Sequence, residues 1–201
     1  MRTFGPEKRI ATTDMRIFIT GVSCIGKTAI GSILASRLSY AFFDLDQEIE
    51  RFFGISIEQL RSRFLTVNSF ITAAAKALAN ILTNPNTRDC VIALPPSGLM
   101  GSYLRVVKKA GGLTVVLTDK PENILNRITF YDIDSRPVEK QLTEKEKHLY
   151  LWEIKKDITH FRKSYGRGDL QVDIFSLSAG QAAEKVKQSL EIVFSKEVAS
   201  K

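Results

Sequence analysis

The chain has 201 residues, of which 44% are hydrophobic and 25% are charged, and this composition is typical of a single folded domain rather than of a disordered chain. No apolar segment approaches the roughly 20 residues of a membrane-spanning helix, and two cysteines are too few for a disulfide framework. These features exclude a membrane partner and a disulfide-stapled secreted scaffold. The expected protein is a cytoplasmic monomer.

The formal net charge of +7 has three interpretations: nucleic-acid binding, attraction of anionic small molecules, or a solvated basic surface. Basic residues are spread along the chain, and no basic run is interleaved with aromatic residues. The sequence therefore predicts no nucleic-acid partner. A solvated basic surface is the first interpretation, and phosphate-bearing ligands are the second.

Residues 1–14 are charged and are interpreted as a flexible N-terminal extension, so that the domain covers 15–201. Beyond them, short apolar segments alternate with longer segments of helical periodicity, which predicts βαβ units and a parallel sheet covered by helices. The predicted strands cover 16–20, 41–45, 90–94, 113–117 and 170–175. The predicted helices include 27–38, 68–82 with Asn68 as its N-cap, and 179–194.

Residues from approximately 131 to 148 are polar, charged and without clear periodicity. In an α/β protein such a segment is either a mobile lid or a surface loop. Trp152 follows in a predicted helix and is interpreted as a packing residue.

The segment GVSCIGKT, residues 21–28, matches the phosphate-loop pattern G-x-x-x-x-G-K-[ST] in full, between a predicted strand and a predicted helix. Glycines let successive backbone N–H groups point at phosphate oxygens, and the helix that follows adds the positive end of its dipole. Lys27 would reach the β- and γ-phosphates, and the Thr28 hydroxyl would ligate Mg²⁺. Cys24 is either a reactive thiol or, as we favour, a small residue of the loop. The predicted nucleotide-binding residues of this segment are Gly21, Cys24, Ile25, Gly26, Lys27, Thr28 and Ala29.

Two carboxylates, Asp44 and Asp46, lie at the end of the second predicted strand. Because side chains alternate along a strand, both can face one ligand only where the strand ends. Opposite a phosphate loop, a carboxylate can hold Mg²⁺ through water or accept a proton from a substrate hydroxyl. The alternative role of Asp46 is to cap a helix that begins at Gln47.

The phosphate loop, the D-x-D about twenty residues later and the IERFFGISIEQL that follows together resemble shikimate kinases, from about Met15 to the C-terminus. The resemblance implies a P-loop NTPase fold, three layers α/β/α with a five-stranded parallel sheet and a lid segment. It also implies ATP and Mg²⁺ as cofactors and a small-molecule hydroxyl acceptor as the partner.

The resemblance assigns site residues position by position. Lys27, Asp46 and Arg136 match catalytic residues: Asp46 grips the acceptor hydroxyl, and Arg136 of the lid pair Arg-Pro approaches the transferred phosphoryl group. Thr28 and Asp44 match the metal residues. Arg127 matches the arginine that lies over the adenine, where a planar guanidinium stacks on a base. The alternative for both arginines is a solvated surface position.

The acceptor half of the family pattern is altered. The family's carboxylate-binding arginine falls on Phe70 or Ile71, and its triple glycine is replaced by a segment with Pro95 and Pro96, which have no N–H to donate. A further acceptor-binding arginine is matched only by Arg162, which is out of register by one residue. The donor half is intact, so the chain resembles a shikimate kinase with a rebuilt acceptor site.

Two functions remain open from the sequence. The first is an ATP-dependent kinase. Its acceptor is shikimate, if Arg162, Arg105 or a lid lysine replaces the missing cation, or else a less acidic, more apolar alcohol. The second is a nucleotide-binding or regulatory module that has lost shikimate phosphorylation. Retention of Asp44, Asp46 and Arg136 favours the kinase.

Overall fold

The centre of the molecule is a five-stranded parallel sheet in the order β2-β3-β1-β4-β7. The computed structural model describes residues 15–131 and 136–199. The strands of this sheet are β1 (Arg16–Thr20), β2 (Ala41–Asp44), β3 (Cys90–Ala93), β4 (Leu113–Thr118) and β7 (Leu170–Asp173). Most of their residues are apolar or β-branched because a parallel sheet is covered by helices on both faces. The five predicted strands are confirmed, with ends that differ by one or two residues.

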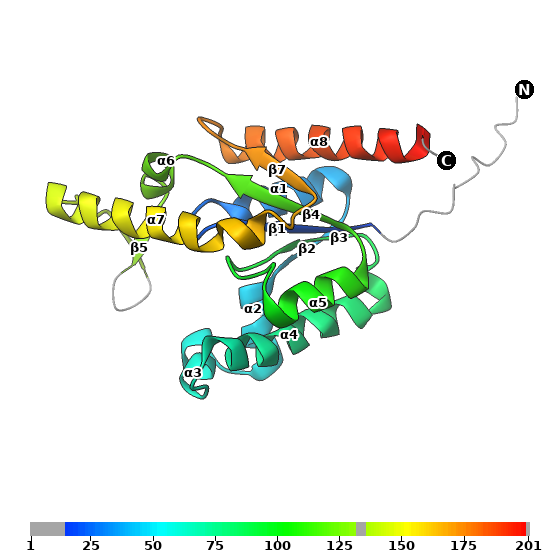
Figure 1. Ribbon diagram of the computed structural model, residues 1–201, viewed down its shortest axis with the longest axis horizontal. Helices are drawn as coiled ribbons and strands as arrows, with labels where there is room; N and C mark the ends of the chain where they lie inside the picture. Colours follow the sequence, from blue (N-terminus) through cyan, green and yellow to red (C-terminus); the bar gives the residue numbers. More distant parts are fainter. Residues whose placement is uncertain (1–14, 132–135, 200–201) are drawn as a thin grey trace, which may run out of the picture.

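Helices form a layer on each side of this sheet (Figure 1). Helices α1 and α8 cover one face, and α4 and α5 cover the other, with α2 and α3 beside α4. The bounds are α1 (Lys27–Leu38), α2 (Leu45–Phe53), α3 (Ile57–Ser62), α4 (Val67–Thr83), α5 (Gly101–Ala110), α6 (Pro121–Leu125), α7 (Glu144–Tyr165) and α8 (Ala179–Ala199), with a 3₁₀ turn at Pro85–Thr87. The predicted three-layer α/β/α fold is thus confirmed. No helix in the described part of the chain is long and apolar enough to cross a membrane.

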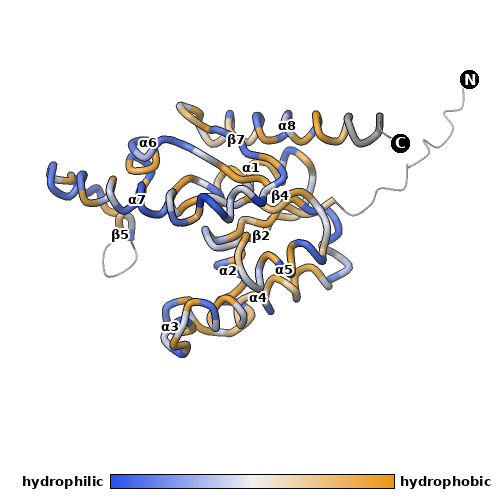
Figure 2. Tube along the Cα trace, viewed as in Figure 1, coloured by the Kyte–Doolittle hydropathy of each residue, from blue (hydrophilic) through white to orange (hydrophobic). Residues whose placement is uncertain are grey.

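The sheet separates two hydrophobic cores. On β1, Ile17 and Ile19 pack with α1 and α8, whereas Phe18 packs with α2, α4 and α5 on the opposite face. This alternation follows from the two-residue side-chain period of a strand. Figure 2 shows hydrophobic segments along the central strands and alternating hydrophobic and hydrophilic turns on α8. Helix α7 joins the first core through residues of its C-terminal half, such as Ile158 and Phe161.

Two boundary predictions need correction or qualification. Asn68 is not the N-cap of its helix, because α4 begins at Val67 and the Thr66 hydroxyl accepts the backbone N–H of Ser69 at 3.1 Å. Thr66 has extended backbone dihedrals, as a cap requires. The predicted extension, residues 1–14, lies outside the described residues.

The predicted lid contains two different structures. Short antiparallel strands β5 (Phe130–Tyr131) and β6 (Pro137–Val138) pair with each other, and residues 132–135 between them lie outside the described part. The last five residues of the predicted lid, from Glu144, belong to α7 instead. A capping box fixes this start, because Thr143 accepts the N–H of Glu146 while the Glu146 carboxylate accepts the N–H of Thr143.

Candidate active site

The phosphate loop joins the central strand β1 to α1. Gly21 and Gly26 have φ angles of +153° and +102°, and a Cβ on Gly21 would lie 2.9 Å from the Leu117 carbonyl oxygen. Both positions therefore require glycine. The loop wraps the N-terminus of a twelve-residue helix, where unpaired backbone N–H groups and the helix dipole favour an anion.

Lys27 lies against this loop. Its ammonium donates hydrogen bonds to the carbonyl oxygens of Gly21 at 3.0 Å and Val22 at 2.9 Å. Burial lowers the pKa of Lys27 to about 8, and the nearby carboxylate of Asp46 opposes this shift. A desolvated ammonium held beside the loop is suited to interact with phosphate oxygens.

Thr28 and Asp44 form the predicted metal pair. The Thr28 hydroxyl donates to Asp44 Oδ2 at 2.5 Å, although the two residues are sixteen positions apart. Asp44 Oδ1 accepts the N–H of Asp46 at 3.0 Å and so caps α2. The predicted cap at Asp46 is therefore wrong: the helix begins two residues earlier, directly after the strand. A hydroxyl and a carboxylate are hard oxygen donors, which fit Mg²⁺.

Asp46 lies in the first turn of α2. Because β2 ends at Asp44 and helical geometry begins at the next residue, the alternation of the strand no longer applies, and both carboxylates reach the same site. Burial by the surrounding walls raises the pKa of Asp46, Asp44 raises it further, and Lys27 opposes the rise. A carboxylate with a raised pKa is a better proton acceptor than an ordinary one.

Two clefts meet at this point. The first, the loop cleft, has a volume of about 1020 Å³, and the second, the α7 cleft, has about 930 Å³. Ser23, Asp46 and Pro96 line both, so the clefts are continuous. The loop cleft brings together most predicted nucleotide and metal residues, namely Cys24, Ile25, Gly26, Lys27, Thr28, Ala29, Asp44 and Arg127. Gly21 is buried and is not part of the described lining.

Cys24 is an exposed residue of the loop with a left-handed φ of 60°. Desolvation raises the pKa of its thiol, and Lys27 only partly opposes this. The thiolate form is therefore disfavoured, which supports the interpretation of Cys24 as a small, unreactive loop residue.

Arg127 is held by a residue that sequence reasoning missed. Its guanidinium donates to Asp119 Oδ2 at 2.5 Å, and the Asp119 side chain is fully buried. Asp119 Oδ1 also accepts the side-chain amide of Asn123 at 2.8 Å and the N–H of Lys120 at 2.7 Å. These bonds fix Arg127 at the wall of the loop cleft. The available signal was a carboxylate directly after the fourth strand.

Arg136 precedes β6 and is exposed. Among the described residues that line the two clefts, Arg136 does not appear, so its assigned catalytic role stays a prediction. Arg105, one candidate for the replacement cation, donates instead to the Ser102 hydroxyl at 2.6 Å on α5. Neither Arg105 nor Arg162 belongs to the described lining of the α7 cleft.

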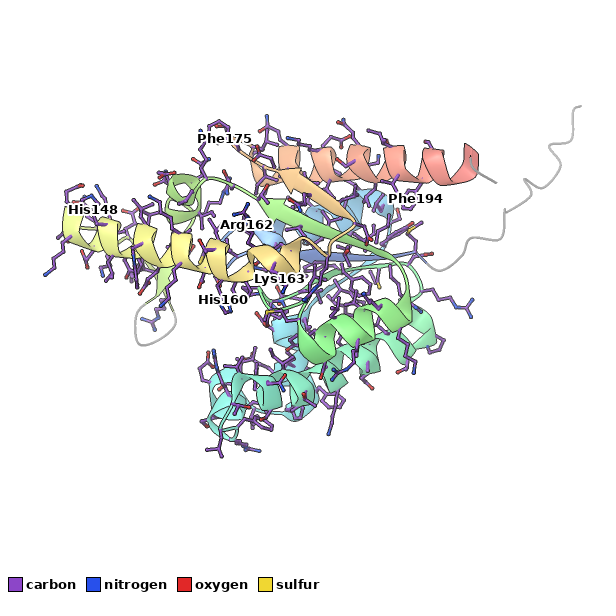
Figure 3. All side chains as sticks on the ribbon, viewed as in Figure 1. His148, His160, Arg162, Lys163, Phe175 and Phe194 are labelled. Atoms are coloured by element: carbon purple, nitrogen blue, oxygen red, sulfur yellow. The ribbon has the colours of Figure 1, made fainter. Side chains whose placement is uncertain are left out.

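The α7 cleft is lined in part by residues for which the sequence predicts another role or none. Trp152 does not pack in the core as predicted: it is 58% exposed and lines this cleft from α7. His160 lies on the same side of α7, below the helix in Figure 3, whereas Arg162 lies above it. The other cleft residues that the argument below uses are Arg61, Phe70, Ile71, Pro95, Tyr103, Lys155, Lys156 and Asp157.

The chain is similar to known proteins in sequence and in fold. A family model described as shikimate kinase matches residues 23–188. The shikimate kinase of Geobacter sulfurreducens is 28% identical over 88% of this chain and 89% of its own length. The crystal structure of shikimate kinase from Aquifex aeolicus has a TM-score of 0.65 at 26% identity and covers 88% of this chain and 96% of that one. Shikimate kinase from Acinetobacter baumannii in complex with shikimate has the same fold, with a TM-score of 0.64 at 23% identity, covering 92% and 95% of the two chains.

Proposed function

The chain belongs to the shikimate kinase family, phosphotransferases with an alcohol acceptor, and we propose that it transfers the γ-phosphoryl group of Mg-ATP to a hydroxyl group of shikimate or a related alcohol. The family uses ATP and generally requires Mg²⁺. The observation that carries the proposal is the continuity of the two clefts at Asp46. A nucleotide in one cleft and an alcohol in the other would meet at this carboxylate.

On this proposal the loop cleft binds the nucleotide. The backbone of residues 21–26 and the ammonium of Lys27 hold the phosphates, and Arg127 lies against the base. Thr28 and Asp44 would hold Mg²⁺, which neutralises negative charge on the phosphate oxygens when it is bound.

The acceptor hydroxyl is placed next to Asp46 from the side of the α7 cleft. Asp46 orients this hydroxyl and accepts its proton as the oxygen attacks the γ-phosphorus atom and the bond from that atom to the bridging oxygen breaks. Lys27 stabilises the negative charge of the transferred group. General-base assistance of this kind contributes about 10²- to 10⁴-fold in rate.

The direct test measures ADP release from Mg-ATP, with and without shikimate, together with an ATP-binding titration. The expected result is ADP release that shikimate stimulates and that Lys27→Ala lowers by about 10²- to 10³-fold. ATP binding without stimulation by shikimate or by other alcohols would contradict the kinase and favour a nucleotide-binding module. Absence of ATP binding would contradict both functions.

A further inference from the structure

The α7 cleft divides into a buried apolar part and an exposed basic part. Ile71 and Tyr103 are 5% and 1% exposed, and Pro95 and Phe70 are partly buried beside them. Arg61, Lys155 and Lys156 line the same cleft but are exposed. Apolar surface therefore lies at the inner end, and positive charge lies at the rim.

Two of these cations lie over aromatic rings on opposite sides of the cleft. Arg61 of α3 lies 6.0 Å from the ring centroid of Phe70 on α4, and Lys156 lies 5.0 Å from the ring centroid of its helical neighbour Trp152 on α7. Cation–π contacts of this length are attractive and reduce the freedom of the long side chains. The cations are thus held at the two edges of one opening.

These cations are not neutralised by carboxylates. Within residues 15–131 and 136–199, no ion pair to a carboxylate is present at Arg61, Lys155 or Lys156, whereas Lys140 pairs with Glu146 at 2.9 Å. The acidic groups that line the cleft are Asp46, at the junction with the loop cleft, and Asp157. His160 is the remaining basic group of the lining. The rim therefore has a local excess of positive charge.

We propose that Arg61 and Lys156, at the rim of the α7 cleft, determine acceptor specificity by binding the carboxylate or phosphate group of an anionic alcohol. The proposal rests on the function proposed above. The inner wall at Phe70 and Ile71 is apolar and offers no cation, so the anion is bound by residues of α3 and α7. The hydroxyl lies at Asp46, the apolar part contacts Ile71 and the prolines, and the anion bridges the two edges.

Trp152 allows a binding test that does not require turnover. It is the only tryptophan of the chain and lines the cleft, so its fluorescence reports occupancy. Titrations in the presence of Mg-ADP would compare shikimate with its methyl ester, and glycerol 3-phosphate with glycerol. We expect at least one anionic probe to bind about tenfold more tightly than its neutral partner. The two pairs distinguish a carboxylate from a phosphate.

The variants Arg61→Met and Lys156→Met remove charge but keep a long side chain. In both, the preference for the anionic probe should fall about tenfold, while binding of the neutral partner stays within about twofold. Arg63→Met and Lys145→Met are matched controls, because both residues are exposed, lie on or beside the same helices and are not part of the described cleft lining. Both controls should retain the preference.

The proposal is overturned if no anionic probe binds more tightly than its neutral partner, or if Arg61→Met and Lys156→Met leave the preference unchanged. A preference for the anion without stimulated ADP release would refute the kinase function and leave the anion site standing. ADP release that shikimate stimulates, together with equal binding of the anionic and neutral probe in both pairs, would refute the anion site and leave the kinase function standing.

Discussion

The loop cleft and the α7 cleft differ in what holds their functional groups. In the loop cleft, Lys27 donates hydrogen bonds to backbone carbonyls and Thr28 donates one to Asp44. Arg127 forms an ion pair with the fully buried carboxylate of Asp119. In the α7 cleft, Lys155 and Lys156 are exposed residues of one helix. Groups fixed by backbone and buried partners suit an invariant task such as phosphate binding. Groups on an exposed helical surface can change without damage to the fold.

Asp46→Asn should produce the largest effect on turnover and distinguish the role of the α7 cleft from that of the loop cleft. We expect acceptor-dependent turnover to fall by about 10²- to 10⁴-fold, because the base is lost, while the affinity for ATP stays within about threefold. Steady-state ADP release and an ATP titration measure the two quantities. A large loss of ATP affinity would show that Asp46 belongs functionally to the loop cleft as well.

Lys27→Ala tests the loop cleft alone. Removal of the ammonium should lower turnover by about 10²- to 10³-fold and weaken ATP binding. In the unaltered chain, kcat/KM for ATP should also fall about tenfold per pH unit above about 8, because Lys27 loses its proton there, below the ordinary 10.5. A profile that is flat to pH 10 would mean that the charged form of Lys27 is not required.

Asp44→Asn is expected to have a smaller effect, confined to the metal. The substitution keeps an oxygen that can cap α2 but removes the charge opposite Thr28. The Mg²⁺ concentration for half-maximal activity should rise about tenfold, and saturating Mg²⁺ should restore much of the turnover. If ADP release has the same Mg²⁺ dependence in the variant, Asp44 is not a metal residue.

Arg127→Ala should produce the smallest effect. Loss of one stacking contact should raise KM for ATP about two- to fivefold, with kcat nearly unchanged. Asp119→Asn is an informative companion, because it leaves Arg127 in place but removes the anion that fixes it. Equal KM values in Arg127→Ala and the original chain would place this arginine outside the nucleotide site.

The contrast between the clefts also explains what the sequence could predict. The phosphate loop is a contiguous motif, and the D-x-D follows the next strand, so short-range patterns predict both. Short apolar segments predict the strands, since a strand that helices cover on both faces, as β1 is covered at Ile17 and Phe18, is apolar on both sides.

The α7 cleft was less predictable because its lining comes from α3, α4, α5, α7 and the end of β3. Trp152 has no local signal that distinguishes an exposed cleft residue from a core residue, so the sequence predicts a packing role for it. Arg61 and Lys156 are ordinary basic residues in the sequence. Only the tertiary arrangement places them at one opening.

The order of the strands sets the distance between the two halves of the candidate site. β3 lies between β2 and β1, so Asp44 at the end of β2 and the phosphate loop after β1 are two strand spacings apart, about 10 Å. Backbone hydrogen bonds set this interval, and no side-chain substitution can stretch or shorten it. The sheet thus fixes the spacing between the end of β2, which carries Asp44, and the phosphate loop, and changes in the lining of the neighbouring cleft leave this spacing unaltered.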